Sequence, residues 1–448
     1  MSQADWDRLQ FYSRKVKNFS AIYTDYPEVA ERRAFNTNLF GGVNTDYLQV
    51  HPSTYFQIAQ IQTSALFPSL RHLHYNLVDK TISHSHIFLF LSPLLDSLEL
   101  TNIGDFENSI VGPFLATLSC PMLSRIVLDS GRMSVDILSK NIVRFKQLQS
   151  LVLTVEVSMS DFSLWEALGT LPSLVDLILK AINPASHPAH AGKNPNCQSG
   201  GPKYFEALES LCVTGSFSLI QDLLDFIDSP YLKSIKIDPV IHHIRVSRRF
   251  SNDQVDNLFT LSMTIVTSKW SQSLKRLVIN DPITSDPGHR YGIPKCLTLL
   301  ADLHEMEIFC LSGWKMENMD DVVRRIAMSW PKLRTLSLPL DETFISLSTL
   351  RIIAENCPEL RRLHVRLDTS AIPPFDSDSS RKSLAHKLED LTVGRERDHP
   401  SITQTCQIQM ARHLNFIFPY LESIQVQDES WSGIRELVKL CQDLRRGQ

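Results

Sequence analysis

The sequence contains few of the residues and spacings that catalytic and metal sites usually require. Only 16 of the 448 residues are glycine, which argues against loops that cradle phosphate groups. The cysteines stand far apart, so the paired spacings of zinc sites and of dithiol redox motifs are absent. No segment matches a serine-hydrolase elbow, a zinc-protease helix, a Walker loop or a dinucleotide fingerprint. We therefore expect no catalytic residues, no cofactor and no metal ligands, and we predict that the protein is not an enzyme.

The sequence also lacks a strong charge of either sign and any long apolar run. Lysine and arginine total 45 and aspartate and glutamate 49, so no overall basic field attracts nucleic acid or an acidic membrane. The longest apolar stretch, near residues 87–95, has about half of the roughly 18 residues needed to cross a bilayer. No basic segment followed by an apolar one opens the chain, and widely spaced cysteines are typical of reduced thiols. We expect a cytoplasmic or nuclear protein that binds neither nucleic acid nor membrane.

One pattern recurs along most of the chain and reads P-x-L-x-x-L-x-L, often with proline at its first position. The copy at Pro68 supplies Leu70, Leu73 and Tyr75. Most copies are 24 to 30 residues apart, close to the period of leucine-rich repeats. The first leucine of each of the thirteen copies is Leu70, Leu95, Leu123, Leu148, Leu174, Leu208, Leu232, Leu274, Leu303, Leu333, Leu360, Leu388 and Leu421.

Each copy predicts a short strand, and the segments between copies predict helices. The final L-x-L has period two, which places both apolar side chains on one face of a strand. Proline ends the preceding helix, and Val135, Leu138, Ile142 and Phe145 show helical spacing between two copies. We predict an α/β fold: an irregular leucine-rich-repeat solenoid with a curved parallel sheet on the concave side and helices on the convex side. The alternative is an α/β protein with alternating strands and helices but no repeat.

Three regions are predicted. Residues 63–430 form the solenoid, and residues 431–448 form a C-terminal capping helix. Residues 1–62 form a short helical N-terminal cap or linker, because Trp6, Leu9, Tyr12, Val16 and Phe19 recur at steps of three or four. This helix either covers the first repeat, as solenoid ends require, or docks on a partner.

The side chains that flank and separate the buried pair of each strand should point outward, onto the concave face. In the copy at Leu303 we expect Met306 and Ile308 inside and Glu305, Glu307 and Phe309 outside. A long surface of varied side chains suits a protein partner. The candidate partner-binding residues are His72, His74, Glu99, Arg125, Lys236, Arg276, Glu305, Glu307, Arg362, His364 and Arg366.

Two loop clusters have weaker alternative interpretations. His187, His190 and Cys197 could ligate a metal, but three candidates on one loop do not make a typical site. The basic cluster of the second loop lacks the interleaved aromatic residues of nucleic-acid sites, which favours a solvated face. Its members are His242, His243, Arg245, Arg248 and Arg249.

Seven segments resemble a fungal family of F-box/leucine-rich-repeat-like proteins. They are DWDRLQFYSRKVKNF (Asp5–Phe19), LFPSLRHLHY (Leu66–Tyr75), FLSPLLDSLEL (Phe90–Leu100), CPMLSRIVL (Cys120–Leu128), LPSLVDLIL (Leu171–Leu179), WPKLRTLSL (Trp330–Leu338) and CPELRRLHV (Cys357–Val365).

In that family, an N-terminal F-box docks on a Skp-type adaptor of a cullin-based SCF ubiquitin ligase, and the repeats hold the substrate. The F-box pattern, roughly LPxEI, is not visible in residues 1–62, and Asp5–Phe19 looks like the stretch that follows it. The resemblance implies a substrate-recognition subunit, with a Skp-type adaptor and cullin as partners if an F-box lies upstream. A protein-interaction scaffold with no ubiquitin link and an enzyme hidden in the array are the alternatives.

Overall fold

A single repeat shows how the sequence pattern becomes structure. Leu123, Ile126 and Leu128 of one copy are fully buried, and the last two lie on strand β4 (Arg125–Ser130). Helix α5 (Val135–Ile142) follows and turns its apolar side to the same interior. Each buried leucine of this kind stabilises the fold by about 1.5–3 kcal/mol, so the repeated pattern is the main source of stability.

Neighbouring repeats are joined by a backbone hydrogen-bond pair just before each strand. The carbonyl oxygen of Asp96 accepts from the N–H groups of Ser124 and Arg125, at 2.9 and 3.1 Å. The carbonyl oxygen of Ser124 accepts in turn from Gln149 and Ser150, at 2.7 and 3.0 Å. Because the same pair recurs at most strands, it marks the residue at which each repeat enters the sheet.

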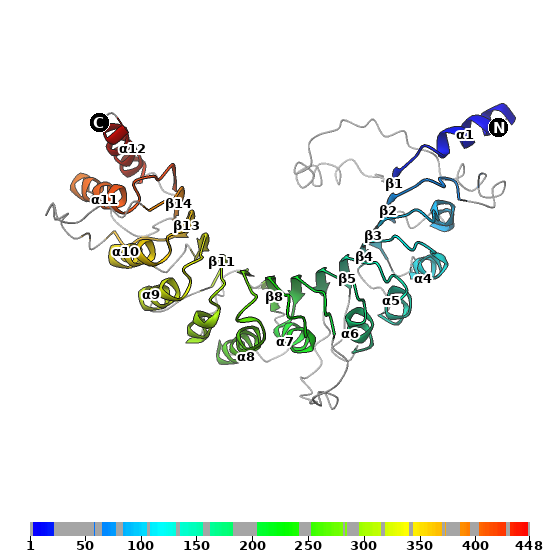
Figure 1. Cartoon of the computed structure of the whole chain (residues 1–448), viewed down its shortest axis with the longest axis horizontal. Helices are drawn as coiled ribbons and strands as arrows, with labels where there is room; N and C mark the ends of the chain where they lie inside the picture. The colour runs from blue at the N-terminus through cyan, green and yellow to red at the C-terminus, as the bar shows by residue number, and fades with distance from the viewer. Residues whose placement is uncertain are drawn as a thin grey trace. The chain divides into compact units, whose positions relative to one another are not determined.

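The computed structural model describes residues 3–21, 58, 65–77, 84–104, 108–130, 135–155, 162–181, 204–241, 252–280, 283–284, 295–314, 319–339, 344–369, 372, 386–394, 403–426 and 431–446. They belong to two compact units, Met1–Leu208 (unit 1) and Glu209–Gln448 (unit 2), which are described separately (Figure 1).

Unit 1 alternates strands and helices around one parallel sheet. Its strands follow the order β1 to β6, and the neighbouring strands pair in parallel. The elements are α1 (Gln3–Ser13), β1 (Asn18–Ala21), β2 (His72–Asn76), the 3-10 helix η1 (His84–Phe90), β3 (Ser97–Ile103), α4 (Asn108–Thr117), β4, α5, β5 (Ser150–Val155), α6 (Phe162–Gly169) and β6 (Asp176–Ala181).

Unit 2 continues the same scheme of strands and covering helices. Its sheet order is β7-β8-β9-β11-β12-β13-β14-β15, and β10 pairs with β8. The elements are β7 (Ser210–Gly215), α7 (Phe217–Phe226), β8 (Ser234–Ile241), α8 (Asn252–Trp270), β9 (Arg276–Ile279), β10 (Ile283–Thr284), the 3-10 helix η2 (Lys295–Asp302), β11 (Ile308–Leu311), α9 (Met319–Ser329), β12 (Thr335–Ser337), α10 (Leu347–Asn356), β13 (Arg362–Val365), β14 (Asp390–Val393), α11 (Gln404–Ile417), β15 (Ser423–Val426) and α12 (Ser432–Arg446).

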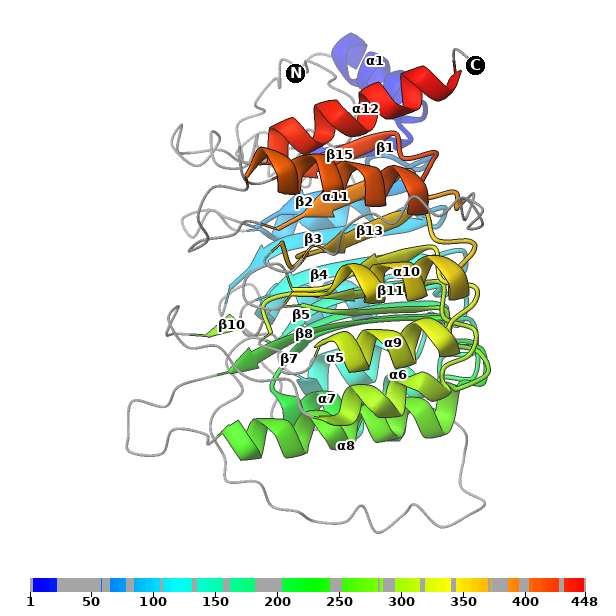
Figure 2. The same ribbon diagram turned by 90° about the vertical axis from the view of Figure 1, so that its left-hand side faces the viewer.

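Within each unit, the repeat helices cover one face of the sheet, and none of the described helices covers the other face (Figure 1). Turned by 90°, unit 2 shows α9, α10 and α11 stacked beside the strands they cover (Figure 2). Its core holds large aromatic residues between the two layers: the Trp270 indole donates to the carbonyl oxygen of Ser229 at 2.7 Å, and Phe259 lies against Trp314. The parallel strands, the register and the helix layer make the chain an α/β leucine-rich solenoid, as predicted.

The N-terminal helix is shorter than the sequence predicts. Helix α1 ends at Ser13, and Phe19 lies on β1, a strand that pairs with β2 ahead of the first predicted repeat. The Phe19 ring stacks on Phe90 and also contacts Phe67, with centroids 4.5 and 5.2 Å apart. This tertiary contact explains why Phe19 joins the sheet rather than the helix.

The predicted register is wrong in one repeat. The strand that follows Leu303 is β11, and it begins at Ile308. Ile308 pairs with Arg276 on β9, so Phe309 aligns with the buried Leu277. Phe309 is fully buried against Trp330, whereas Ile308 is half-exposed on the bare face. The sequence contains two overlapping frames at this point, and the second one buries the phenylalanine.

The predicted region boundaries at residues 62 and 430 stay predictions. A helix, α12, does occupy most of the segment 431–448, with Trp431 and Ile434 buried. Among the described residues, no helix has the length and apolar character needed to cross a bilayer.

Candidate partner-binding surface

The candidate surface in each unit is the strand face, defined as the side of the sheet that the repeat helices leave bare. Outward side chains on neighbouring strands are aligned in rows, because the strands are parallel and in register. The first row of unit 2 reads Ser210, Ser234, Arg276, Ile308, Thr335, Arg362, Asp390 and Ser423. The second row reads Cys212, Lys236, Val278, Cys310, Ser337, His364, Thr392 and Gln425.

In unit 1, the predicted residues lie on the strand face and form a polar cluster. His74 on β2 lies between Ser20 and Glu99, with Nδ1 3.1 Å from the Ser20 hydroxyl and Nε2 3.8 Å from the carboxylate. His72 and Arg125 are exposed in the neighbouring row. This arrangement offers hydrogen-bond donors and one carboxylate to a polar partner.

The remainder of the unit 1 strand face carries an apolar strip that was not among the predicted candidates. Val127, Val152 and Ile178 are aligned on β4, β5 and β6 and point to the bare side. Val127 is 9% exposed, and the other two are half-exposed. The sequence signal for this strip is the apolar residue in the middle of L-x-L in three consecutive copies. Apolar side chains of this kind are typical of the core of a protein interface.

In unit 2, the candidates that lie on the strand face are Lys236, Arg276, Arg362 and His364. Lys236 is paired with Asp238 at 3.3 Å. Arg276 and Arg362 are exposed, and their side chains have no ion pair or hydrogen bond within the part of the chain that the structure describes. Burial, with the nearby positive charge of Arg362, lowers the pKa of His364 below its ordinary value of 6.5.

Three other candidates do not lie on the strand face. The register shift places Glu305 and Glu307 in the turn before β11, where Lys332 and Lys275 pair with them at 2.6 and 3.0 Å. The hydrogen bond from Lys332 lowers the pKa of Glu305.

Arg366 is the third candidate that does not lie on the strand face, because it is buried. Only 6% of the residue is exposed, and its guanidinium carbon lies 4.0 Å from the centre of the Phe344 ring. The residue follows the last position of β13, where the chain leaves the sheet. A cation over an aromatic ring is favourable, so Arg366 serves the fold rather than the surface.

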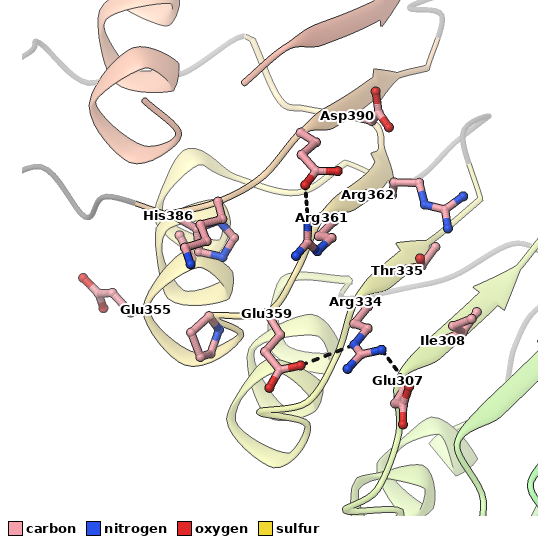
Figure 3. Close-up of a pocket in the computed structure, with 14 residues that line it drawn as sticks. Glu307, Ile308, Arg334, Thr335, Glu355, Glu359, Arg361, Arg362, His386 and Asp390 are labelled. Atoms are coloured by element: carbon pink, nitrogen blue, oxygen red, sulfur yellow. Dashed lines mark hydrogen bonds and ion pairs between the residues drawn. The ribbon is translucent and has the colours of Figure 1, made fainter. Parts of the chain in front are cut away.

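A groove of about 1130 Å³ lies along the edge where β11 to β14 begin (Figure 3). Its strand-face side is formed by Ile308, Thr335, Arg362 and Asp390. The remaining lining comes from the turns and helix ends and is mostly charged. These residues are Glu307, Arg334, Ala354, Glu355, Pro358, Glu359, Arg361, His386, Lys387 and Glu389.

Most charges in the groove are paired with the next repeat. Arg334 bridges Glu307 and Glu359, with nitrogen–oxygen distances of 3.5 and 3.3 Å, and Arg361 pairs with Glu389 (Figure 3). Every one of these ion pairs includes an arginine side chain that is more than half exposed, so each pair stabilises the fold by less than about 1 kcal/mol.

Few cationic side chains of the groove are unpaired. Among those lining it, Arg362 and Lys387 have no ion pair or hydrogen bond within the described residues. No group of histidine, cysteine and acidic residues in the described chain is placed to hold a metal ion.

The two loop clusters cannot be placed. His187, His190 and Cys197, considered above as metal ligands, lie outside the described residues. The basic cluster near residue 242 also lies outside them, namely His242, His243, Arg245, Arg248 and Arg249.

Comparison with known proteins gives matches among solved structures only. No protein-family model matches the chain, and no curated protein matches it. The structure of an internalin (InlF) from Listeria monocytogenes is similar over 74% of this chain and 82% of that chain, with 14% identity and a TM-score of 0.37. A chain of the yeast Rad7 and Elc1 complex is similar over 96% of both chains, with 13% identity and a TM-score of 0.38. The strand order, register and leucine pattern of the chain itself establish its fold class, an α/β leucine-rich solenoid.

Proposed function

We propose that this protein is a non-catalytic, protein-binding repeat protein that holds its partner on the strand face. The supporting observation is that the two faces of the sheet differ. Helices cover one face (Figure 1), and the register places polar, charged and apolar side chains in aligned rows on the other. Strands at the edge of a sheet recruit partners by backbone pairing, but a bare face recruits them through side chains. The rows described above supply such side chains in both units.

The finer proposal is a substrate-recognition subunit related to the F-box adaptors of SCF ubiquitin ligases, acting in the cytoplasm or nucleus. Its support is the sequence resemblance carried by segments such as Asp5–Phe19 and Trp330–Leu338. The alternative is an interaction scaffold with no ubiquitin link, which is favoured by the absence of an LPxEI pattern within residues 1–62.

Proximity labelling with the full chain tests the strand-face proposal. Ser97, Ser234 and Thr392 are half-exposed on the strand face, and tyrosine at each position would obstruct a partner without placing a new group in the core. The matched control places tyrosine at Lys140, Thr264 and Arg412, exposed positions of helices α5, α8 and α11. We expect the strand-face variant to lose labelled partners that the helix variant keeps. An identical set of labelled proteins for the two variants would overturn the proposal.

Co-purification tests the ubiquitin-ligase link separately. The full chain should retain a Skp-type adaptor and a cullin if the finer proposal holds. Recovery of strand-face partners without either protein would favour the scaffold.

A further inference from the structure

Two exposed arginines occupy the same row of the unit 2 strand face. Arg276 on β9 aligns with Ile308, Ile308 with Thr335, and Thr335 with Arg362 on β13. We call these four residues the arginine row. In the groove view, Ile308, Thr335 and Arg362 stand on the strand side, apart from the paired charges of the turns (Figure 3).

The two arginines of the arginine row differ from the cations at Lys275, Lys332 and Arg334 because their guanidinium groups are unpaired. Lys275, Lys332 and Arg334 in the turns pair with glutamates at 3.0, 2.6 and 3.3 Å. Arg276 and Arg362 make no such pair with any described residue. An unpaired guanidinium retains its full capacity to bind a carboxylate with two parallel hydrogen bonds.

The surface between the two arginines is neutral. Ile308 and Thr335 separate them in the first row, and Cys310 and Ser337 lie beside these in the second row. Burial raises the pKa of the Cys310 thiol although both arginines act to lower it, so the thiol is uncharged at neutral pH. A ligand would therefore meet positive charge at two points and a mixed apolar and hydroxyl floor between them.

The spacing of the arginines sets the spacing of the ligand's charges. Three strand intervals of about 4.8 Å separate the two Cα atoms by about 14 Å. An extended peptide advances about 3.3–3.6 Å per residue, so four residues cover that distance. Asp390 follows Arg362 in the row and would repel a further acidic residue beyond it.

We propose that the arginine row binds an extended peptide segment whose two acidic side chains stand four residues apart, one at Arg276 and one at Arg362. The peptide crosses the strands rather than pairing with them. This inference rests on the proposed function, since it specifies the chemistry of a partner for the same strand face.

Selection from a displayed library of random linear peptides against the full chain tests the inference. We expect enrichment of aspartate or glutamate at a spacing of four residues. The best peptide, labelled with fluorescein, is then titrated by fluorescence anisotropy against the chain and its variants. Arg276→Glu and Arg362→Glu should each weaken binding about tenfold or more, the loss expected for one charged hydrogen-bonded contact. Replacing either acid of the peptide with glutamine should have a similar effect.

The matched control variants are Arg325→Glu and Arg412→Glu. Both arginines are exposed on helices, α9 and α11, and have no ion pair within the described residues. Each control changes the net charge by the same amount as the strand-face variants. If the position of the arginine rather than the overall charge determines affinity, the controls should bind the peptide within about twofold of the wild-type affinity. A peptide with lysine in place of one acid should recover binding to the corresponding Arg→Glu variant, which a folding defect would not allow.

Three results would overturn the inference. The first is a library that yields no binding peptide, and the second is a library that yields peptides without paired acidic residues. The third is a set of selected acidic peptides that bind the Arg276→Glu and Arg362→Glu variants as tightly as the wild type. The proposed function would survive each of these if tyrosine on the strand face still removed labelled partners. Loss of that effect would instead count against the proposed function itself.

Discussion

The backbone N–H of Leu388 donates a hydrogen bond to Nδ1 of His386, at a distance of 3.1 Å. The other ring nitrogen, Nε2, lies 2.8 Å from the carbonyl oxygen of Cys357 and must donate to it. The imidazole is therefore held in one neutral tautomer, at the position that proline occupies in other repeats. Burial lowers the pKa of His386 below its ordinary value of 6.5.

Acidification should weaken this turn. A histidine with a lowered pKa binds its proton less readily in the folded state, so its stabilisation is present above about pH 6.5 and is lost as the pH falls through the folded pKa. Protonation of Nδ1 would also remove the acceptor for the Leu388 N–H. We expect the wild type to unfold at a lower urea concentration at pH 5 than at pH 7.5.

A substitution separates His386 from the other histidines. His386→Gln should lower the free energy of unfolding by about 1–3 kcal/mol at pH 7.5, the cost of lost buried hydrogen bonds, and by less at pH 5. Lys387→Gln, at an exposed neighbour, should change it by less than about 0.5 kcal/mol at both pH values. Equal losses for His386→Gln at the two pH values would refute the explanation.

The register of β11 can be tested by two adjacent alanine substitutions. Phe309→Ala should reduce the free energy of unfolding by about 3–5 kcal/mol, because the ring is fully buried 5.1 Å from Trp330. Ile308→Ala should cost less than about 1 kcal/mol, since Ile308 is half-exposed. Urea denaturation followed by tryptophan fluorescence measures both, and the reverse order would support the frame that starts at Leu303.

A similar pair in unit 1 tests the role of the first leucine of each repeat. Leu123 is fully buried, whereas its neighbour Met122 is 65% exposed. Leu123→Ala should cost about 2–5 kcal/mol and Met122→Ala less than about 0.5 kcal/mol. Comparable losses at the two positions would mean that the turn, rather than the leucine side chain, carries the stability.

The buried cysteines should resist alkylation. Burial raises the pKa of the Cys357 thiol to about 12 and that of Cys120 to about 11, so little reactive thiolate exists at pH 8. Brief treatment of the native chain with iodoacetamide, followed by peptide mapping, should modify the half-exposed Cys406 well before either buried residue. Denaturation in urea should make all three react, and rapid native labelling of Cys357 would show that its turn opens.

The leucine pattern was sufficient to predict strands, helices and the solenoid because each copy determines its own strand locally. Apolar residues at period two, such as Leu151 and Leu153 on β5, can be buried only if the strand turns that face inward, and the parallel stacking then follows. The same alternation places His74, Arg276 and Arg362 in the rows of the strand face.

Tertiary structure alone decided the remaining features. At Leu303 two overlapping frames fit the pattern, and contact with Trp330 selects the one that buries Phe309. Phe19 joins a strand because its ring meets Phe90, which is distant in sequence.

The availability of charges was also decided by tertiary structure. A cation on one repeat is neutralised by an acid of the next repeat, as Lys275 is by Glu307, 32 residues further along the chain. No local pattern reveals such a pair. The amino-acid sequence by itself therefore determined which side chains face out, and the stacking of repeats decided which of them remain free to meet a partner.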